Sequence, residues 1–200
     1  MQRLVLASHN PGKIREIAAL LAPLEIEVVP QAELGIAEAE EPHDTFLENA
    51  LAKARHASRA SSLPALADDS GLCVDALGGD PGVHSAYYAG REGSRETRDA
   101  RNNEKLLKSV KAERRAYYAC VVVLTRTASD PLPLVAQGIW RGEIARAPRG
   151  ENGFGYDPLF FLKEYDRTAA ELDPGEKNRI SHRGQALARL VELLRDPGRA

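Results

Sequence analysis

Two adjacent acidic residues at the end of a short apolar run constrain this chain more than any other feature. Asp68 and Asp69 follow the apolar segment 63–67 and precede Ser70 and Gly71. The apolar segment predicts a buried strand, and the Ser-Gly pair predicts its end. Two carboxylates shielded from water lose hydration and repel each other, so they need a cation or a positively charged ligand beside them. The pair therefore indicates a divalent-metal and general-base centre or, alternatively, a solvated turn, because Asp and Ser are common in turns.

The overall composition is that of a single globular domain and excludes several classes of protein. The chain has 200 residues, of which 43% are hydrophobic, enough for a sizeable core. Its 27 basic and 29 acidic residues leave no basic excess of the kind that nucleic-acid or membrane-surface binding requires. The longest apolar run, 117–124, is too short for a membrane span, and Cys73 and Cys120 fit no metal-ligand spacing. We expect a soluble, cytoplasmic protein with reduced, buried thiols and with no nucleic-acid or membrane partner.

The polar loop 8–13, between a predicted strand at 4–7 and a predicted helix at 14–21, is a candidate phosphate site. Asn10 is a suitable N-cap for the helix, so free backbone N–H groups and the positive end of the helix dipole would point into the loop. Lys13 is unfavourable in a first helical turn unless its ammonium group faces an anion. An ordinary capped helix with one exposed lysine explains the segment equally well.

The acidic loop 38–44 precedes a predicted helix that begins after Thr45. Thr45 and Glu48 have the spacing of a capping box. Most acidic loops are simply solvated, but this one lies shortly before the paired aspartates and could lend Glu40 or Glu41 to the same metal. Oxygen ligands of this kind suit Mg²⁺, which needs only one or two protein carboxylates.

The second half of the chain predicts a helix at 97–110 and a twisted antiparallel pair of strands at 116–125 and 134–147. The segment 150–158 then places three glycines around two aromatic residues. Glycines permit close backbone approach and aromatic faces can stack on a nucleobase, although a flexible turn is the alternative.

Basic residues gather where the C-terminal helix is predicted to start. Lys177, His182 and Arg183 could contact phosphate or base edges, or they could form a common charged helix cap. Taken alone, the charged cap is the favoured interpretation.

Six motifs, in order along almost the whole chain, carry a family resemblance. They are Ser8-His9-Asn10-Pro11-Gly12-Lys13, Phe46-Leu47-Glu48-Asn49-Ala50, Ala67-Asp68-Asp69-Ser70-Gly71-Leu72, Gly78-Gly79-Asp80-Pro81-Gly82-Val83, Phe154-Gly155-Tyr156-Asp157-Pro158 and Ser181-His182-Arg183-Gly184. Together they resemble the inosine/xanthosine triphosphate pyrophosphatase family, and in particular its bacterial branch, the dITP/XTP pyrophosphatases.

The resemblance implies both a fold and an activity. The implied fold is α/β: one domain over 1–200 with a long twisted mixed β-sheet flanked by helices, two lobes with a central active-site cleft, and a homodimer. The implied reaction is the Mg²⁺-dependent hydrolysis of non-standard purine nucleoside triphosphates, ITP, dITP and XTP, to the monophosphate and pyrophosphate. Such an enzyme cleanses the nucleotide pool and prevents misincorporation into DNA and RNA.

The resemblance also implies roles for individual residues. Asp69 is the expected proton acceptor that activates water, and Glu40 and Asp69 are the expected metal ligands. The expected substrate contacts are Ser8, His9, Asn10, Pro11, Gly12, Lys13, Ser70, Phe154, Gly155, Tyr156, Asp157, Lys177, His182 and Arg183. The sequence departs from the family pattern at Pro42 and His43, within the acidic loop, so the choice between Glu40 and Glu41 stays open.

Two other functions remain open at this stage. One is a phosphatase of the related Maf-type fold that acts on modified pyrimidine nucleotides. The other is a module that binds nucleoside triphosphates without turnover.

Selectivity for a 6-oxo purine would come from fixed donors near His182 and Arg183, which adenine would leave mismatched.

Overall fold

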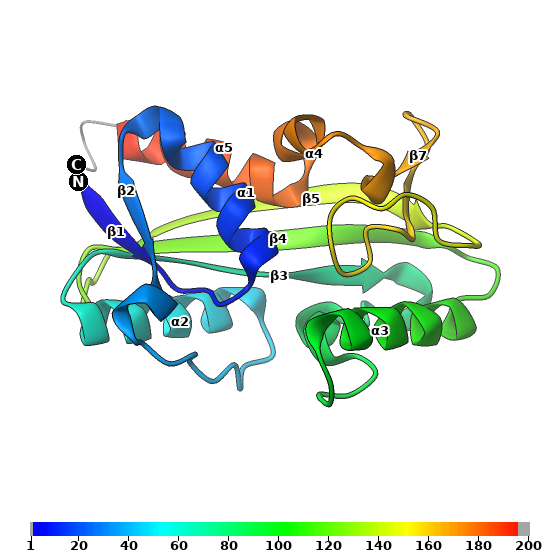
Figure 1. The fold of residues 1–200 in the computed structure, drawn as a ribbon, viewed down its shortest axis with the longest axis horizontal. Helices are drawn as coiled ribbons and strands as arrows, with labels where there is room; N and C mark the ends of the chain where they lie inside the picture. Colours follow the sequence, from blue (N-terminus) through cyan, green and yellow to red (C-terminus); the bar gives the residue numbers. More distant parts are fainter. Residues whose placement is uncertain (1, 196–200) are drawn as a thin grey trace. The chain divides into compact units, whose positions relative to one another are not determined.

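The computed structural model describes residues 2–195, which form two compact units (Figure 1). Within the described part, unit 1 comprises 2–69, Cys120–Gly138 and 183–195. Unit 2 comprises Ser70–Ala119 and Ile139–His182. Among these residues, no helix is both long and apolar enough to cross a membrane.

One mixed sheet of seven strands is the framework, in the order β2-β1-β3-β4-β5-β6-β7. Strand β1 runs parallel to β2 and β3, whereas β6 runs antiparallel to β5 and β7. The strands are β1 (Arg3–Leu6), β2 (Glu27–Pro30), β3 (Ala65–Val74), β4 (Arg115–Thr125), β5 (Leu134–Ile144), β6 (Phe160–Leu162) and β7 (Arg167–Thr168). The predicted α/β class with a mixed sheet flanked by helices is confirmed.

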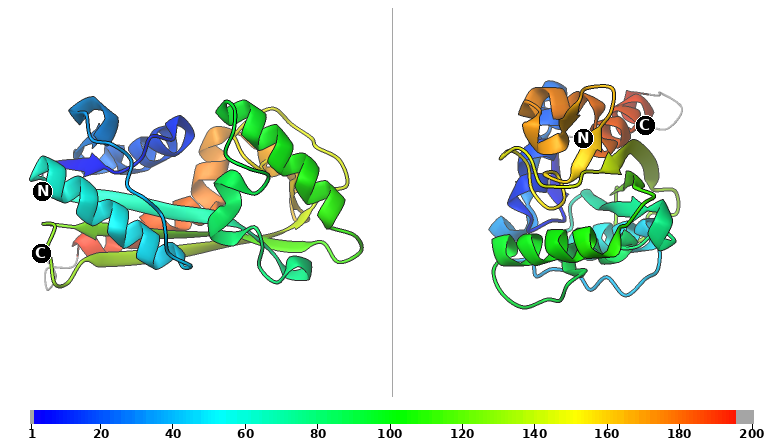
Figure 2. Two further views of the ribbon diagram at one scale, coloured as in Figure 1. Left: turned by 90° about the horizontal axis from the view of Figure 1, so that it is seen from below. Right: turned by 90° about the vertical axis from the view of Figure 1, so that its right-hand side faces the viewer.

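In unit 1, helices cover both faces of the strands (Figures 1 and 2). Helices α1 (Pro11–Leu21) and α5 (His182–Arg195) pack on the face that carries Leu4, Leu6 and Leu66. Helix α2 (Phe46–Ser61) packs its small residues Ala50, Ala54 and Ala57 on the face that carries Val5, Ala65 and Ala67. Successive side chains of a strand point to opposite faces, so neighbouring residues of β1 and β3 enter different cores.

In unit 2, α3 (Arg95–Ser109) and α4 (Pro174–Ile180) lie on opposite faces of the strands (Figure 2). The core centres on the aromatic rings of Tyr118, Trp140 and Phe160. Short 3₁₀ turns complete the two units: Ala22–Leu24 and Gln31–Leu34 in unit 1, and Asp75–Leu77, Gly82–Tyr87 and Ala169–Glu171 in unit 2.

The two predicted N-cap residues, Asn10 and Thr45, are confirmed. The Oδ1 atom of Asn10 accepts hydrogen bonds from the backbone N–H groups of Gly12 and Lys13, at 2.9 and 3.2 Å. The hydroxyl of Thr45 accepts one from the N–H of Glu48, at 3.2 Å. Both predicted thiols are buried and free of disulfides.

The predicted break at Ser70 and Gly71 is wrong, because β3 runs without interruption from Ala65 to Val74. Gly71 does not form a turn but lets β3 pass close to Gly82 and Ser85. A Cβ atom at this position would lie 2.2 Å from the carbonyl oxygen of Gly82 and 2.5 Å from the hydroxyl of Ser85. Only glycine lets the strand pass this segment.

Candidate functional site

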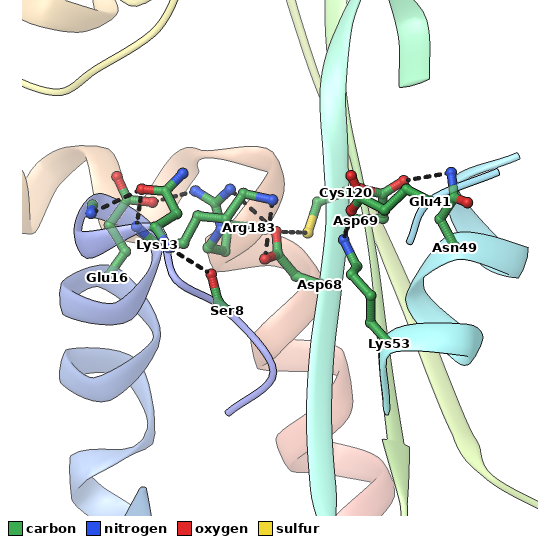
Figure 3. Close-up of polar contacts among 12 residues, drawn as sticks. Ser8, Lys13, Glu16, Glu41, Asn49, Lys53, Asp68, Asp69, Cys120 and Arg183 are labelled. Atoms are coloured by element: carbon green, nitrogen blue, oxygen red, sulfur yellow. Dashed lines mark hydrogen bonds and ion pairs between the residues drawn. The ribbon is translucent and has the colours of Figure 1, made fainter. Parts of the chain in front are cut away.

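Asp68 and Asp69 lie side by side in β3 but point to opposite faces of the sheet in unit 1 (Figure 3). Asp68 faces α1 and α5, where it meets Lys13 and Arg183. Asp69 faces α2, where it meets Lys53. The expectation that the two carboxylates share one centre is therefore wrong, because β3 continues through them and a strand alternates its side chains.

Asp68 is the centre of a buried group of charges, which we call the Asp68 cluster: Lys13, Glu16, Asp68, Cys120 and Arg183. The Nε and Nη2 atoms of Arg183 donate to Oδ2 of Asp68 at 3.3 and 3.2 Å. The Nη1 atom of Arg183 donates to Glu16, and the Nζ atom of Lys13 lies 3.2 Å from Oδ1 of Asp68. Both Asp68 and Arg183 are almost completely buried, so each charge is stabilised by its partner rather than by water.

The cations of the cluster keep Asp68 ionised. Burial alone would raise the pKa of this carboxyl, but the charges of Lys13 and Arg183 outweigh burial and hold the pKa well below its usual range. The thiol of Cys120 donates to the same carboxylate at 3.8 Å, and burial raises its pKa. Cys120 is therefore a neutral neighbour rather than a nucleophile.

Asp69 belongs to a second group of unit 1, the Asp69 cluster, formed by Glu41, Asn49, Lys53 and Asp69. The Nζ atom of Lys53 lies 3.0 Å from Oδ1 of Asp69 and also donates to Glu41. The amide of Asn49 donates to Oδ2 of Asp69 at 3.4 Å. The same amide exchanges two hydrogen bonds of 3.0 Å with the backbone of His43, which ties the acidic loop to α2.

Burial and charge shift the pKa values of this cluster in a direction that suits proton transfer. Burial raises the pKa of Asp69, and Lys53 opposes that shift. Burial would lower the pKa of Lys53, but Asp69 and Glu41 outweigh it and raise that pKa. Asp69 is thus a buried carboxylate held by two donors, Lys53 and Asn49, and a carboxylate is one of the groups that act as general bases.

The Asp69 cluster has the donor chemistry of a Mg²⁺ site. Two carboxylates converge on one ammonium group, and hard oxygen ligands in this number are what Mg²⁺ requires. Glu40 and Glu41 are both exposed, but Glu41 pairs with the ammonium group of Lys53. Among residues 2–195, no set of three or more His, Cys, Asp or Glu side chains is arranged to hold a metal. Two carboxylates, with water and substrate as further ligands, are thus what this cluster would offer.

In the loop of residues 8–13, more backbone N–H groups are hydrogen-bonded within the loop than the sequence predicts. Asn10 itself occupies the N–H groups of Gly12 and Lys13, and the hydroxyl of Ser8 accepts from the N–H of Asn10 at 3.2 Å. The expectation that these N–H groups are free is therefore wrong for Gly12 and Lys13, because the cap satisfies both. Nδ1 of His9 lies 3.8 Å from Glu38, and the side chain of Pro11 is exposed.

A third group of polar and aromatic side chains lies in unit 2: the Asp157 cluster of Tyr118, Phe154, Asp157, Lys177 and His182. Asp157 is buried, and its Oδ2 atom accepts from Nζ of Lys177 at 2.6 Å and from the N–H of Phe154 at 2.9 Å. Lys177 also lies 5.0 Å from the centre of the Phe154 ring. One carboxylate thus holds a cation and an aromatic residue next to each other.

Tyr118 connects this carboxylate to His182. The hydroxyl of Tyr118 donates to Oδ1 of Asp157 at 3.5 Å, and its ring stacks on the imidazole with 4.6 Å between centroids and 7° between planes. Burial, followed by the charge of Asp157, raises the pKa of Tyr118 well above its ordinary value, so the phenol stays a donor. Tyr156 is also buried, and its hydroxyl donates to the backbone oxygen of Ser85 at 2.8 Å.

The structure thus assigns each predicted site residue to one group or leaves it apart. Lys13 and Arg183 lie in the Asp68 cluster, Asp69 lies in its own, and Phe154, Asp157, Lys177 and His182 lie in the Asp157 cluster. Ser70 is half-buried on β3, and Gly155 is half-buried with a backbone φ of +64°.

Asn49, Lys53 and Tyr118 are among the participants that were missed from the sequence, although each of these three left a signal. Asn49 and Lys53 are polar residues on the buried stripe of α2, at helical spacing from Ala50, Ala54 and Ala57. Tyr118 occupies an inward position of β4, where a phenol needs a hydrogen-bond partner.

Comparison with known proteins shows the family to which the chain belongs. The model of the Ham1 family matches residues 4–193. The dITP/XTP pyrophosphatase of Bordetella pertussis is 61% identical over 200 residues, covering 99% of this chain and 93% of its own. That of Nitrosomonas europaea is 62% identical over 196 residues, covering 97% and 95%.

Solved structures agree over the same length. A HAM1 protein from Coxiella burnetii superimposes with a TM-score of 0.88 at 50% identity, covering 97% of this chain and 98% of its own. A nucleoside-triphosphatase, the dITP/XTP pyrophosphatase of Mycobacterium abscessus, gives 0.72 at 41% identity, covering 97% and 100%. The matches span both units.

Proposed function

Because the chain belongs to the Ham1 family, we propose that it hydrolyses non-standard purine nucleoside triphosphates such as dITP and XTP to the monophosphate and pyrophosphate. The observation that carries the proposal is the match of about 60% identity over nearly the full length of relatives named for this activity. Homodimer formation and a cytoplasmic location stay predictions.

Asp69 is the residue that we propose as the general base. A water molecule attacks the α-phosphorus, the bond between the α-phosphorus and the bridging oxygen breaks, and pyrophosphate leaves. Asp69 accepts the proton of that water, and its raised pKa supports the assignment. Lys53 and Asn49 hold the Asp69 carboxylate in place and donate to it from α2.

Mg²⁺ is the metal that we propose for the Asp69 cluster, with Asp69 and either Glu40 or Glu41 as ligands. Glu41 is the better supported, because it shares the ammonium of Lys53 with Asp69. When bound, Mg²⁺ would neutralise phosphate charge and lower the pKa of a bound water. The ammonium group of Lys53 would then either share the carboxylates of Asp69 and Glu41 with the metal ion or move away from them.

The Asp68 cluster of unit 1 and the Asp157 cluster of unit 2, each taken by itself, offer chemistry that suits a different part of a nucleotide. Lys13, half-buried and held by Asp68, supplies a fixed positive charge for the phosphates. Phe154, Lys177 and His182 offer an aromatic face and polar groups for the base, as a 6-oxo purine requires. Arg183 is engaged with Asp68 and Glu16, which favours a role in holding the start of α5 over direct contact with the base.

The test is pyrophosphate release from ITP, dITP, XTP, GTP and ATP, each with Mg²⁺ and with a chelator. We expect metal-dependent turnover of the first three far above that of GTP and ATP. Equal rates for all five, or preferred turnover of modified pyrimidine nucleotides, would overturn the substrate assignment. Binding of ITP without pyrophosphate release would favour the non-catalytic module.

A further inference from the structure

Helix α3 of unit 2 carries three side chains toward the glycine-aromatic loop at regular helical spacing. Arg95, Asp99 and Asn103 are four residues apart, so they lie on one face of the helix. Each contacts Phe154 or Gly155, which lie more than fifty residues further along the chain. None of the three belongs to a motif that the proposed function uses.

Asp99 and Asn103 together bind both backbone polar groups of Gly155. The Oδ2 atom of Asp99 accepts from the Gly155 N–H at 3.0 Å, and the Nδ2 atom of Asn103 donates to the Gly155 carbonyl at 2.8 Å. These groups belong to the two peptide planes on either side of the Gly155 Cα atom. Fixing both planes therefore fixes the φ and ψ angles of Gly155, which has a φ of +64° that other residues rarely adopt.

The orientation of the Asn103 amide is determined by its surroundings. Its Nδ2 atom donates to the Gly155 carbonyl and also to the Asp99 carbonyl, at 2.8 and 2.9 Å. A rotated amide would place its oxygen against two carbonyl oxygens, so only the observed orientation satisfies the contacts. Asn103 thus acts as a donor that only another donor could replace.

Phe154 is held between this helix and the Asp157 cluster. Asp157 binds the Phe154 N–H, while Asp99 binds the next N–H along the chain. The guanidinium of Arg95 lies 5.2 Å from the centre of the Phe154 ring, and its Nε atom lies 3.9 Å from the Asp99 carboxylate. Asp99 therefore sets the position of the backbone that carries Phe154 and also of a cation beside its ring.

We propose that Asp99 and Asn103 are positioning residues that set the affinity for the nucleoside part of the substrate by fixing Phe154. The inference rests on the proposed function, in which Phe154 meets the base. A purine gains affinity from an aromatic face only when that face is already in position, because ordering a mobile ring on binding costs free energy. The phosphates do not depend on Phe154. Their affinity should therefore be independent of Asp99 and Asn103, which we call the clamp.

The test compares Asp99→Ala, Asp99→Asn and Asn103→Asp with the wild type. Asp99→Ala removes the acceptor, and we expect KM for ITP to rise at least tenfold while kcat changes less than about threefold, because only binding of the base is affected. Asp99→Asn keeps an oxygen acceptor and should restore KM to within about threefold. Asn103→Asp has nearly the same shape but places an oxygen against the Gly155 carbonyl, so it should resemble Asp99→Ala.

Binding without turnover separates positioning from a general structural role. Calorimetry should show that each variant's affinity for IMP falls by the same factor as its KM for ITP rises. Inorganic tripolyphosphate should bind each variant as tightly as it binds the wild type. Glu104→Ala is the matched control, since Glu104 lies on α3 but is exposed and pairs with Lys108 at 2.5 Å. It should change neither ligand's affinity.

Distinct outcomes would overturn the two proposals. Wild-type KM and IMP affinity in Asp99→Ala, or equal loss of IMP and tripolyphosphate affinity, would overturn positioning by the clamp. A wild-type protein that binds IMP but releases no pyrophosphate from ITP would overturn the proposed function. The IMP affinities of the variants and the wild type would still show whether the clamp positions Phe154. A wild-type protein that does not bind IMP would overturn positioning by the clamp, whereas the proposed function would still be decided by pyrophosphate release from ITP.

Discussion

The carboxylates of Asp68 and Asp69, neighbours in β3, are neutralised on opposite faces of the sheet by different lysines, Lys13 and Lys53. This relationship separates two tasks that the adjacent acids could have shared. Asp68 anchors Lys13 and Arg183, whereas Asp69 remains within reach of the acidic loop and its Glu41. The consequences can be tested residue by residue.

Replacing Asp69 by Asn should abolish turnover and leave the fold intact. The amide has nearly the same shape but cannot accept the proton, and general-base catalysis is typically worth about 10²–10⁴-fold. The measurement is pyrophosphate release from ITP together with circular dichroism. Asp75→Asn, an exposed aspartate just after β3, is the control and should retain full activity. Near-normal activity of the Asp69 variant would refute the assigned base.

Replacing Lys53 by Met should make the protein's stability depend on Mg²⁺. Without the ammonium, the carboxylates of Asp69 and Glu41 lose their cation, and breaking the buried pair of Lys53 with Asp69 costs about 3–5 kcal/mol. If Mg²⁺ binds these carboxylates, it should raise the melting temperature of the variant more than that of the wild type. Lys108→Met removes an exposed ion pair and should show no such response. Equal Mg²⁺ effects in both proteins would place the metal elsewhere.

Replacing Arg183 by Leu should destabilise the fold by about 3–5 kcal/mol, because Asp68 and Glu16 would lose their partner. Urea unfolding measures this cost. Arg15→Leu, on the exposed face of α1, should change the free energy of unfolding by less than about 0.5 kcal/mol. A stable Arg183 variant with a raised KM for ITP would instead support direct contact with the substrate.

Two glycines of the aromatic loop should respond differently to alanine. Both have positive φ angles, +78° at Gly153 and +64° at Gly155, so alanine strains the backbone at either position by about 1–3 kcal/mol. A Cβ atom at Gly153 would lie 2.0 Å from Oδ2 of Asp157, whereas one at Gly155 would meet nothing within 4 Å. Gly153→Ala should therefore raise KM for ITP about tenfold or more above the value for Gly155→Ala. Similar KM values would show that the Asp157 cluster does not govern binding.

Asp130, in the connection between β4 and β5, should contribute to stability at neutral but not at low pH. Burial would raise its pKa, but backbone N–H groups of Arg126 and Leu132 and the side chain of Arg126 outweigh it and lower that pKa. A carboxyl with a lower pKa in the folded state stabilises above its unfolded value of about 3.9, and that contribution is lost as the pH falls through the folded pKa. Urea unfolding between about pH 2 and 6 should show a smaller rise in stability for Asp130→Asn than for the wild type. An unchanged slope would contradict the assignment.

The sequence by itself determined the local features, because they depend on neighbouring residues. The cap of α1 by Asn10, the N-cap of α2 by Thr45 and the buried strand that leads into the acids all follow from short-range hydrogen bonding and hydrophobic pattern. The six motifs likewise identified the family that the comparisons show. The opposite directions of Asp68 and Asp69 follow from strand alternation, but only once β3 is known to continue through Gly71.

Only the tertiary structure decided which partner each charged group meets. Arg183 reaches Asp68 across 115 positions of the chain and Lys53 reaches Asp69 across 16, and no local pattern encodes such pairings. They arise because buried charges must find counter-charges wherever strand order and helix packing bring them. For the same reason Gly155 meets Asp99 and Asn103, since the packing within unit 2 brings α3 against a loop fifty residues away.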